Sequence, residues 1–322
     1  MSDLGKNRFK TDCWKADSLK SVDLYNQWFM TSAPKAFREA RKGVIKNVMA
    51  AIDGFDLLRR ISIDVLIHHP QYLSVLRSCT APPLAIDRLA GLSGTTRNFV
   101  ASFEKGKLPK KLSQDDIRVY LDNVISIIMK LIDYDIFPWL KDIKNPSSQM
   151  VNRSASIIAD RISGALADPI IRNSQEIRQL TMIGDYLESR GYVRLHAKEI
   201  QSIESMPKKT FAFHLNVPVV MGDEKSVNMP IDVVIQPKYN EPTHFPLLVE
   251  CKSAGDFANT NKRRKEEATK INQLRHTYGE NSITFILFLC GYFDYSYLGY
   301  EASENIDWVW EHRITDFLEF GV

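Results

Sequence analysis

The fold is decided by two short runs, PIDVVI at residues 230–235 and PLLVECK at residues 246–252. Both runs are apolar and rich in β-branched or aliphatic residues, which predicts two strands. The stretch between them holds two prolines and an asparagine, which indicates a connecting loop. Each strand nevertheless carries charge: Asp232 lies in the first, and Glu250 and Lys252 lie in the second. Charged side chains in strands this apolar need a structural or functional reason.

The spacing of these charges predicts a shared site. Side chains alternate between the two faces of a strand, so Glu250 and Lys252 share one face and Cys251 points to the other. If the two strands pair as neighbours, Asp232 lies beside Glu250. Two adjacent carboxylates repel unless a cation lies between them, and a hard divalent ion such as Mg²⁺ prefers oxygen ligands. The set therefore suits metal-assisted hydrolysis of a phosphodiester, with the lysine orienting or polarising a water molecule.

The pattern of Asp232 followed by Glu250-Cys251-Lys252 resembles the D-(x)n-E-x-K signature of the PD-(D/E)XK nucleases. An isolated E-x-K pair is more often a solvated strand face, but longer runs support the nuclease interpretation. These runs are similar to the XamI-type restriction endonucleases and lie at residues 253–267, 288–294 and 308–314. The likeness covers residues 170–322 well and the N-terminal half more loosely. Ile231 stands where the superfamily's name has proline, a position that varies among its members.

The resemblance implies a Type II restriction endonuclease, which hydrolyses phosphodiester bonds in both strands of double-stranded DNA with Mg²⁺. It implies that Asp232 and Glu250 ligate the metal, with the Cys251 carbonyl as a further ligand. Lys252 would activate the attacking water. The resemblance also implies a glutamate on the helix that leads into the core, for which Glu176 is the candidate. The alternative for Glu176 is an acid of the first helical turn, stabilised by the helix dipole.

Two partners follow from this interpretation besides DNA. Cutting both strands of a duplex suggests a homodimer, or a monomer that nicks the strands in succession. A cognate DNA methyltransferase is expected in the same restriction-modification system.

The order of predicted elements gives the fold class. Residues 260–278 have a helical pattern and residues 282–290 form a long apolar run, so a strand–helix–strand unit follows the Glu250 strand. We therefore expect an α/β (α+β) catalytic domain over residues 146–322, with a central mixed sheet flanked by helices. Its other predicted elements are a helix at 173–190 and strands at 192–195 and 210–217.

Residues 1–145 are predicted to form an all-helical, DNA-binding domain. After a polar lead of about 20 residues, apolar residues recur at intervals of three and four through residue 58, with a break expected at Pro34. Residues 113–140 predict a long amphipathic helix. The run Asn-Pro-Ser-Ser at 145–148 is the candidate linker to the second domain.

Residues 84–109 have the spacing of a helix-turn-helix. Gly94 allows the tight turn, and Thr95 or Thr96 can cap the second helix. Arginine and asparagine at the start of such a helix are the residue types that pair with guanine and adenine. The alternative is a purely structural helix–glycine–helix turn, which is frequent in helical domains. The candidate DNA contacts are Arg97, Asn98, Lys105 and Lys107 here, and Lys262, Arg263, Arg264 and Lys265 after the catalytic strand.

Composition adds only broad limits. The chain has 42 basic and 39 acidic residues, so a net charge of +3 does not by itself indicate nucleic-acid binding. The four cysteines are widely separated, which argues against a zinc site and fits a reducing, cytoplasmic location. Two other functions remain open at this stage: a non-catalytic helix-turn-helix regulator, and a non-specific repair nuclease of the same superfamily.

Overall fold

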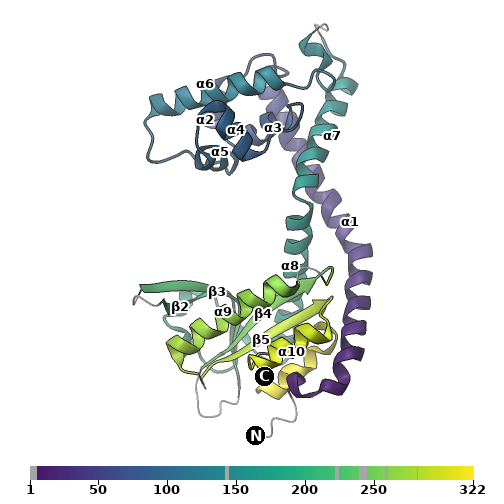
Figure 1. Ribbon diagram of the computed structural model, residues 1–322, viewed down its shortest axis with the longest axis vertical. Coiled ribbons are helices and arrows are strands. Elements are labelled where there is room, and N and C mark those ends of the chain that lie inside the picture. Colours follow the sequence, from purple (N-terminus) through teal and green to yellow (C-terminus); the bar gives the residue numbers. More distant parts are fainter. Residues whose placement is uncertain (1–5, 142–144, 222–224, 239–244, 258–259, 281) are drawn as a thin grey trace. The chain divides into compact units, whose positions relative to one another are not determined.

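The computed structural model describes residues 6–141, 145–221, 225–238, 245–257, 260–280 and 282–322. The chain divides into two compact units, shown with their elements in Figure 1. The sheet unit comprises residues 1–34 and 171–322, and the helical unit comprises residues 35–170. This division differs from the predicted ranges 1–145 and 146–322, because the start of the chain packs with the sheet.

The sheet unit contains one mixed sheet, as predicted. In the described part of the chain the strand order is β1-β2-β3-β4-β5-β6. The pairs β2–β3 and β3–β4 are antiparallel, whereas β1–β2, β4–β5 and β5–β6 are parallel. The strands are β1 (Val193–Arg194), β2 (Thr210–Met221), β3 (Lys225–Gln236), β4 (Leu247–Ala254), β5 (Thr284–Gly291) and β6 (Asp307–Trp310).

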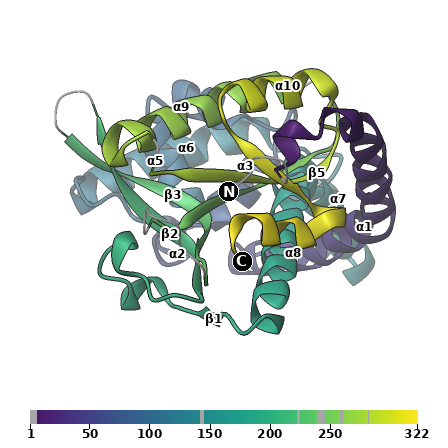
Figure 2. The same cartoon turned by 90° about the horizontal axis from the view of Figure 1, so that it is seen from below.

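Helices cover both faces of this sheet (Figure 2). One face packs against α9 (Thr260–Tyr278) and α10 (Tyr295–Ser303), and the other packs against α8 (Ala167–Ser189) and the 3-10 segment η7 (Glu311–Phe320). With both faces covered, β5 is buried from residue 285 to residue 291 and does not alternate between buried and exposed positions. The predicted strand–helix–strand unit is therefore confirmed as β4–α9–β5. Two further 3-10 turns lie between β1 and β2: η5 (Ala197–Glu199) and η6 (Ile203–Ser205).

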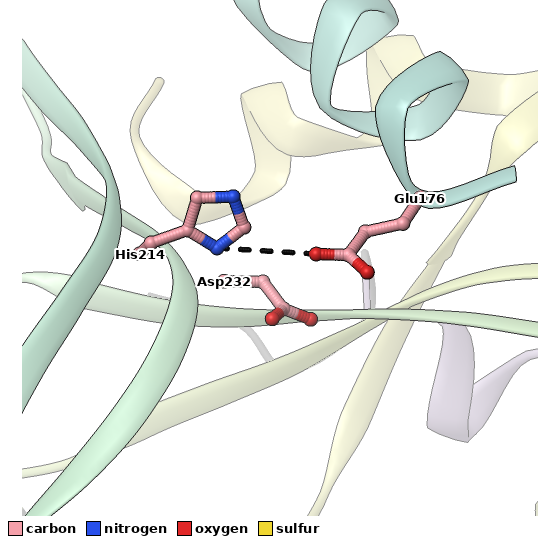
Figure 3. Close-up of side chains that lie close together, drawn as sticks. All are labelled: Glu176, His214 and Asp232. Atoms are coloured by element: carbon pink, nitrogen blue, oxygen red, sulfur yellow. Dashed lines mark ion pairs between the residues drawn. The ribbon is translucent and has the colours of Figure 1, made fainter. Parts of the chain in front are cut away.

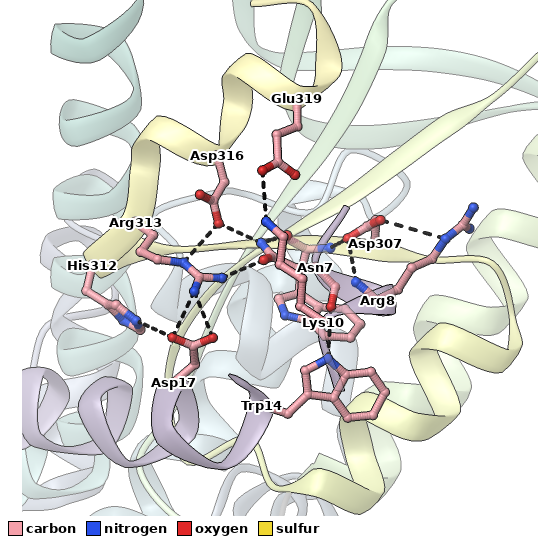
Figure 4. Close-up of polar contacts among 11 residues, drawn as sticks. Asn7, Arg8, Lys10, Trp14, Asp17, Asp307, His312, Arg313, Asp316 and Glu319 are labelled. Carbon is pink, nitrogen blue, oxygen red and sulfur yellow. Dashed lines mark hydrogen bonds and ion pairs between the residues drawn. The ribbon is translucent and has the colours of Figure 1, made fainter. Parts of the chain in front are cut away.

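The start of the chain is not the irregular polar lead that was expected. It forms the 3-10 turns η2 (Asn7–Phe9) and η3 (Thr11–Cys13) and then enters α1 (Trp14–Gly54). Figure 4 shows its polar contacts with the end of the chain. The Asn7 amide donates to the Trp308 carbonyl (2.8 Å), and Arg313 forms an ion pair with Asp17 (3.0 Å). Trp14 is buried, so the segment combines an apolar anchor with polar contacts.

The helix α1 also runs unbroken through Pro34, where a break was predicted. Trp28 and Ala33, which precede the proline on this helix, are buried. Their packing offsets the hydrogen bond that proline cannot donate.

The helical unit is built around its own apolar core. The predicted helix at 113–140 ends early, at Leu131, because Ile132 is extended and forms an isolated bridge with Thr80. The helices of this unit after α1 are α2 (Ile63–His68), α3 (Tyr72–Ser78), α4 (Ile86–Ser93), α5 (Arg97–Glu104), α6 (Gln114–Leu131) and α7 (Ser148–Ala165), with the 3-10 turn η4 (Pro138–Leu140) before α7. Within the described residues no helix is long and apolar enough to cross a membrane.

Residues 84–109 contain the helices α4 and α5, joined by a short turn. Gly94 ends α4 with φ +66°, a left-handed conformation that suits glycine. The Thr96 hydroxyl accepts the Phe99 N–H (3.1 Å) and so caps α5. Val100 and Phe103 point into the core.

A glycine beside the end of β4 provides a test of the packing. Gly291 has φ +106°, and a Cβ on it would lie 2.1 Å from the Ala254 carbonyl oxygen. We expect Gly291→Ala to lower the free energy of unfolding by about 3 kcal/mol or more, because backbone must move. Gly299→Ala, with nothing within 4 Å, is the control and should change it by no more than about 1 kcal/mol. Chemical denaturation of both variants measures this, and equal stabilities would contradict the clash.

Candidate active site

The predicted carboxylates come together where β3 and β4 stop pairing. The antiparallel register joins Val233 to Val249, so one step further Asp232 faces Glu250. The hydrogen bonds between the two backbones end there. Beyond that point the Asp232 side chain links the strands, because its Oδ2 accepts the Cys251 N–H at 2.8 Å. The side chain of Asp232 is thereby fixed to the strand that carries Glu250.

Glu250 is a buried carboxylate held between two ammonium groups. Its side chain is 3% exposed. Oε1 accepts a hydrogen bond from Lys270 Nζ on α9 (2.8 Å), and Oε2 lies 3.3 Å from Lys252 Nζ. Lys252 also lies 3.6 Å from the buried Glu267, likewise on α9. Burying a carboxylate alone would be costly, so the two lysines account for its presence inside the sheet unit.

The neighbouring charges shift the ionisation of the site. Burial, followed by the negative charge of Glu250, raises the pKa of Asp232 to about 6. Burial alone would lower the pKa of Lys252, but the charges of Glu250, Glu267 and Asp232 outweigh it and raise that pKa. Lys252 is therefore a cation at neutral pH. Burial also raises the pKa of the Cys251 thiol, so its sulfur stays protonated.

Two further elements, α8 and β2, place possible metal ligands beside Asp232 (Figure 3). One ligand atom each from Glu176 on α8, His214 on β2 and Asp232 lies within 4.8 Å of the others. His214 Nδ1 and Glu176 Oε1 are 3.9 Å apart. These are two oxygen donors and one nitrogen donor, a set that can hold a divalent cation.

His214 was missed from the sequence. It interrupts an apolar run, which was a signal, but its orientation depends on a local conformation. His214 has φ +52° in the middle of β2, where an L residue rarely lies. The flanking pairs Phe213–Val233 and Leu215–Ile231 keep their register, so His214 faces Asp232 across the strands.

The site contains a pocket of about 250 Å³. It contains Asp232, Glu250 and Lys252 from the strands, and Arg172, Gln175 and Glu176 from α8. Cys251 also lines it. All the residues predicted as catalytic or metal-binding thus meet in a single cavity.

The predicted DNA contacts lie on or directly after α5, and on α9. Arg97 and Asn98 are exposed at the start of α5, and Arg97 forms an ion pair with Asp87 (3.0 Å). Lys105 and Lys107 are exposed just after α5. On α9, Lys265 is exposed and the Arg264 guanidinium lies 3.5 Å from the centre of the Tyr300 ring. The side chains of Lys262 and Arg263 lie outside the described residues.

Comparison with known proteins confirms the family resemblance. A profile of the XamI restriction endonuclease family matches residues 56–310. The chain is 46% identical over 315 residues to the Type II restriction enzyme SalI of Streptomyces albus G, covering 98% of this chain and 99% of that protein. It is 28% identical over 196 residues to the Type II restriction enzyme XamI of Xanthomonas campestris pv. amaranthicola, covering 60% and 62% respectively. No solved structure matches.

Because the pKa of Asp232 is raised, we expect that replacing it by a neutral residue stabilises the folded protein, by an amount that depends on pH. The folded carboxyl has a pKa of about 6, above its ordinary value of 3.8, so ionising it costs stability as the pH rises through this range. In metal-free protein, Asp232→Asn should raise the melting temperature at pH 8, by roughly 2–4 °C for each kcal/mol relieved. The gain should shrink towards pH 4.

Thermal unfolding across this pH range measures the effect. Asp185→Asn removes an exposed carboxylate from α8 and serves as the control. If Asp232→Asn raised the melting temperature equally at pH 4 and pH 8, the ionised carboxylate would not be destabilised by burial and by Glu250.

Proposed function

Because the chain belongs to the XamI restriction endonuclease family, we propose that it is a Type II site-specific deoxyribonuclease that cuts both strands of double-stranded DNA with Mg²⁺. The family membership supports endodeoxyribonuclease activity. The observation that carries the finer proposal is the pocket itself, which joins Asp232, Glu250 and Lys252 in one cavity.

The donor set fits a hard divalent ion. Asp232 is destabilised as an anion by burial and by Glu250, and a cation between the carboxylates would relieve both effects. We propose that Asp232 and Glu250 hold Mg²⁺, with the Cys251 carbonyl and Glu176 as further oxygen donors and His214 close by. When bound, the ion supplies Lewis-acid polarisation of the phosphodiester.

Lys252 would act as a fixed positive charge rather than as a base. Its ammonium group stays protonated at neutral pH, because three carboxylates raise its pKa above the ordinary value. It can donate hydrogen bonds that orient the attacking water, and it stabilises negative charge that develops on the phosphate. Glu267, which is fully buried on α9, fixes the direction of this side chain.

DNA recognition is proposed for the helical unit. The exposed Arg97 and Asn98 begin α5, as base-reading residues do in a helix-turn-helix, and Lys105 and Lys107 suit phosphates. The ion pair of Arg97 with Asp87 is largely exposed, so little free energy is lost when DNA replaces it.

The assembly and the protecting enzyme are also proposals. A homodimer would provide one pocket for each strand of the duplex. A cognate DNA methyltransferase would protect the host's own sites.

The first test is incubation of the purified protein with phage and plasmid DNA, with Mg²⁺ or with EDTA. We expect discrete bands that require the metal. A smear would indicate a non-specific nuclease. Intact DNA that shifts in a native gel would indicate a binding protein without nuclease activity.

The site assignment has its own test. Lys252→Ala and Asp232→Ala should each lower the cleavage rate by at least about 10²-fold, because each removes charge that stabilises the transition state. Binding to DNA should remain. Lys198→Ala, an exposed lysine of the same unit, is the control. Wild-type rates in either pocket variant would refute the assignment.

A further inference from the structure

The helix α8 presents more to the pocket than the predicted Glu176. Arg172, Gln175, Glu176 and Gln179 all line the cavity, at the three- and four-residue spacing of one helical face. Glu176 lies near His214 and Asp232, and the Gln179 amide donates to the Phe288 carbonyl (3.3 Å). Among the described residues, Arg172 and Gln175 have no comparable side-chain hydrogen bond or ion pair.

Gln175 is buried but not satisfied. The residue is only 4% exposed, and its side-chain Nε2 has no hydrogen-bond partner among the described residues. Burying an amide N–H₂ without an acceptor is unfavourable, and native proteins rarely do so without a reason. Because this group lines the pocket, the missing acceptor is expected to come from a molecule that enters it.

Arg172 is a cation without a counter-charge. It is exposed at the pocket, and no carboxylate pairs with it in the described part of the chain. Arg178, which lies further along the same helix, differs: it forms an ion pair with Glu311 (2.8 Å) and lies over the Trp28 ring (5.1 Å). Arg178 therefore serves the fold, whereas the Arg172 guanidinium is available to a ligand.

The charge of the pocket shows which ligand these groups suit. Asp232, Glu250 and Glu176 would repel the phosphodiester of DNA. Lys252 is shared between Glu250 and Glu267. An incoming phosphate thus needs donors that no carboxylate occupies. A guanidinium can bind two phosphate oxygens at once, and an amide N–H₂ can donate to a third position.

We propose that Arg172 and Gln175 form an anion subsite, which binds the non-bridging oxygens of the phosphodiester that is cut. The inference rests on the proposed nuclease function and adds two substrate-binding residues to it. Arg172 supplies charge and a forked pair of donors. Gln175 supplies one neutral donor, whose hydrogen bond is made only when the phosphate is present.

The test uses the full-length protein and a duplex that contains the site mapped by digestion. Single-turnover cleavage is measured with Mg²⁺, and binding is measured by fluorescence anisotropy at several salt concentrations with Ca²⁺ in its place. Arg172→Ala should slow cleavage about 10²-fold and reduce the salt slope by about 0.9, the value for one lost phosphate contact. Gln175→Met, which keeps the shape, should slow cleavage and leave the slope unchanged.

A modified duplex separates a phosphate contact from a structural effect. A methylphosphonate at the cut position removes the phosphate's charge and should weaken binding by the wild type. It should weaken binding by Arg172→Ala much less, because the contact is already lost. Arg190→Ala, an exposed arginine just beyond α8, is the control and should behave as the wild type does.

The outcomes distinguish the two proposals. A wild type that does not cut DNA refutes the proposed function. A wild type that cuts, together with an Arg172→Ala variant of unchanged rate and salt slope, refutes the anion subsite alone. If the melting temperature shows that Arg172→Ala does not fold, the cleavage rates of Arg172→Lys and Gln175→Met test the subsite in its place. Wild-type cleavage by both of them would overturn the subsite.

Discussion

The buried carboxylate of Glu250 is the constraint on which the sheet unit depends. A negative charge in the middle of a covered sheet must be balanced at short range, and Lys252 and Lys270 do so. Lys270 comes from α9, so the helix is bound to β4 by charge as well as by its apolar face. The strand–helix–strand unit is thereby held in one arrangement, in which Lys252 and Glu267 are also fixed.

A second constraint aligns the other half of the site. Regular alternation would send Asp232 and His214 to the face that holds Val234 and Ala212, which is the α9 side. The left-handed conformation of His214 changes this alternation in the middle of β2, and residues on either side of Asp232 change faces in the same way. The result is that Asp232 can meet Glu176 on α8 while its Oδ2 remains bound to the β4 backbone. The pocket thus draws on both sides of the sheet.

The features that can be predicted from the sequence are those that depend on adjacent residues and on the spacing of apolar residues. The apolar runs of β3 and β4 make strands predictable, and their antiparallel pairing then places Asp232 by Glu250. Other features depend on contacts between distant residues. Lys270 lies on a helix rich in charged residues, and its partner Glu250 lies on another element, so the sequence does not single it out. The side chain of His214 is aimed by a single unusual dihedral angle. The N-terminal turns depend on Trp308, which lies 301 residues beyond Asn7, and on Arg313.

Those contacts between the two ends of the chain have a consequence for biosynthesis. Asn7, Trp14 and Asp17 can find their partners on β6 and η7 only after those two elements have left the ribosome. The helical unit contains no such requirement, because its residues 35–170 are made consecutively. We therefore expect the two units to mature at different times during translation, with the pocket completed last. Contacts of this sequence separation also make the closing step slow compared with helix formation.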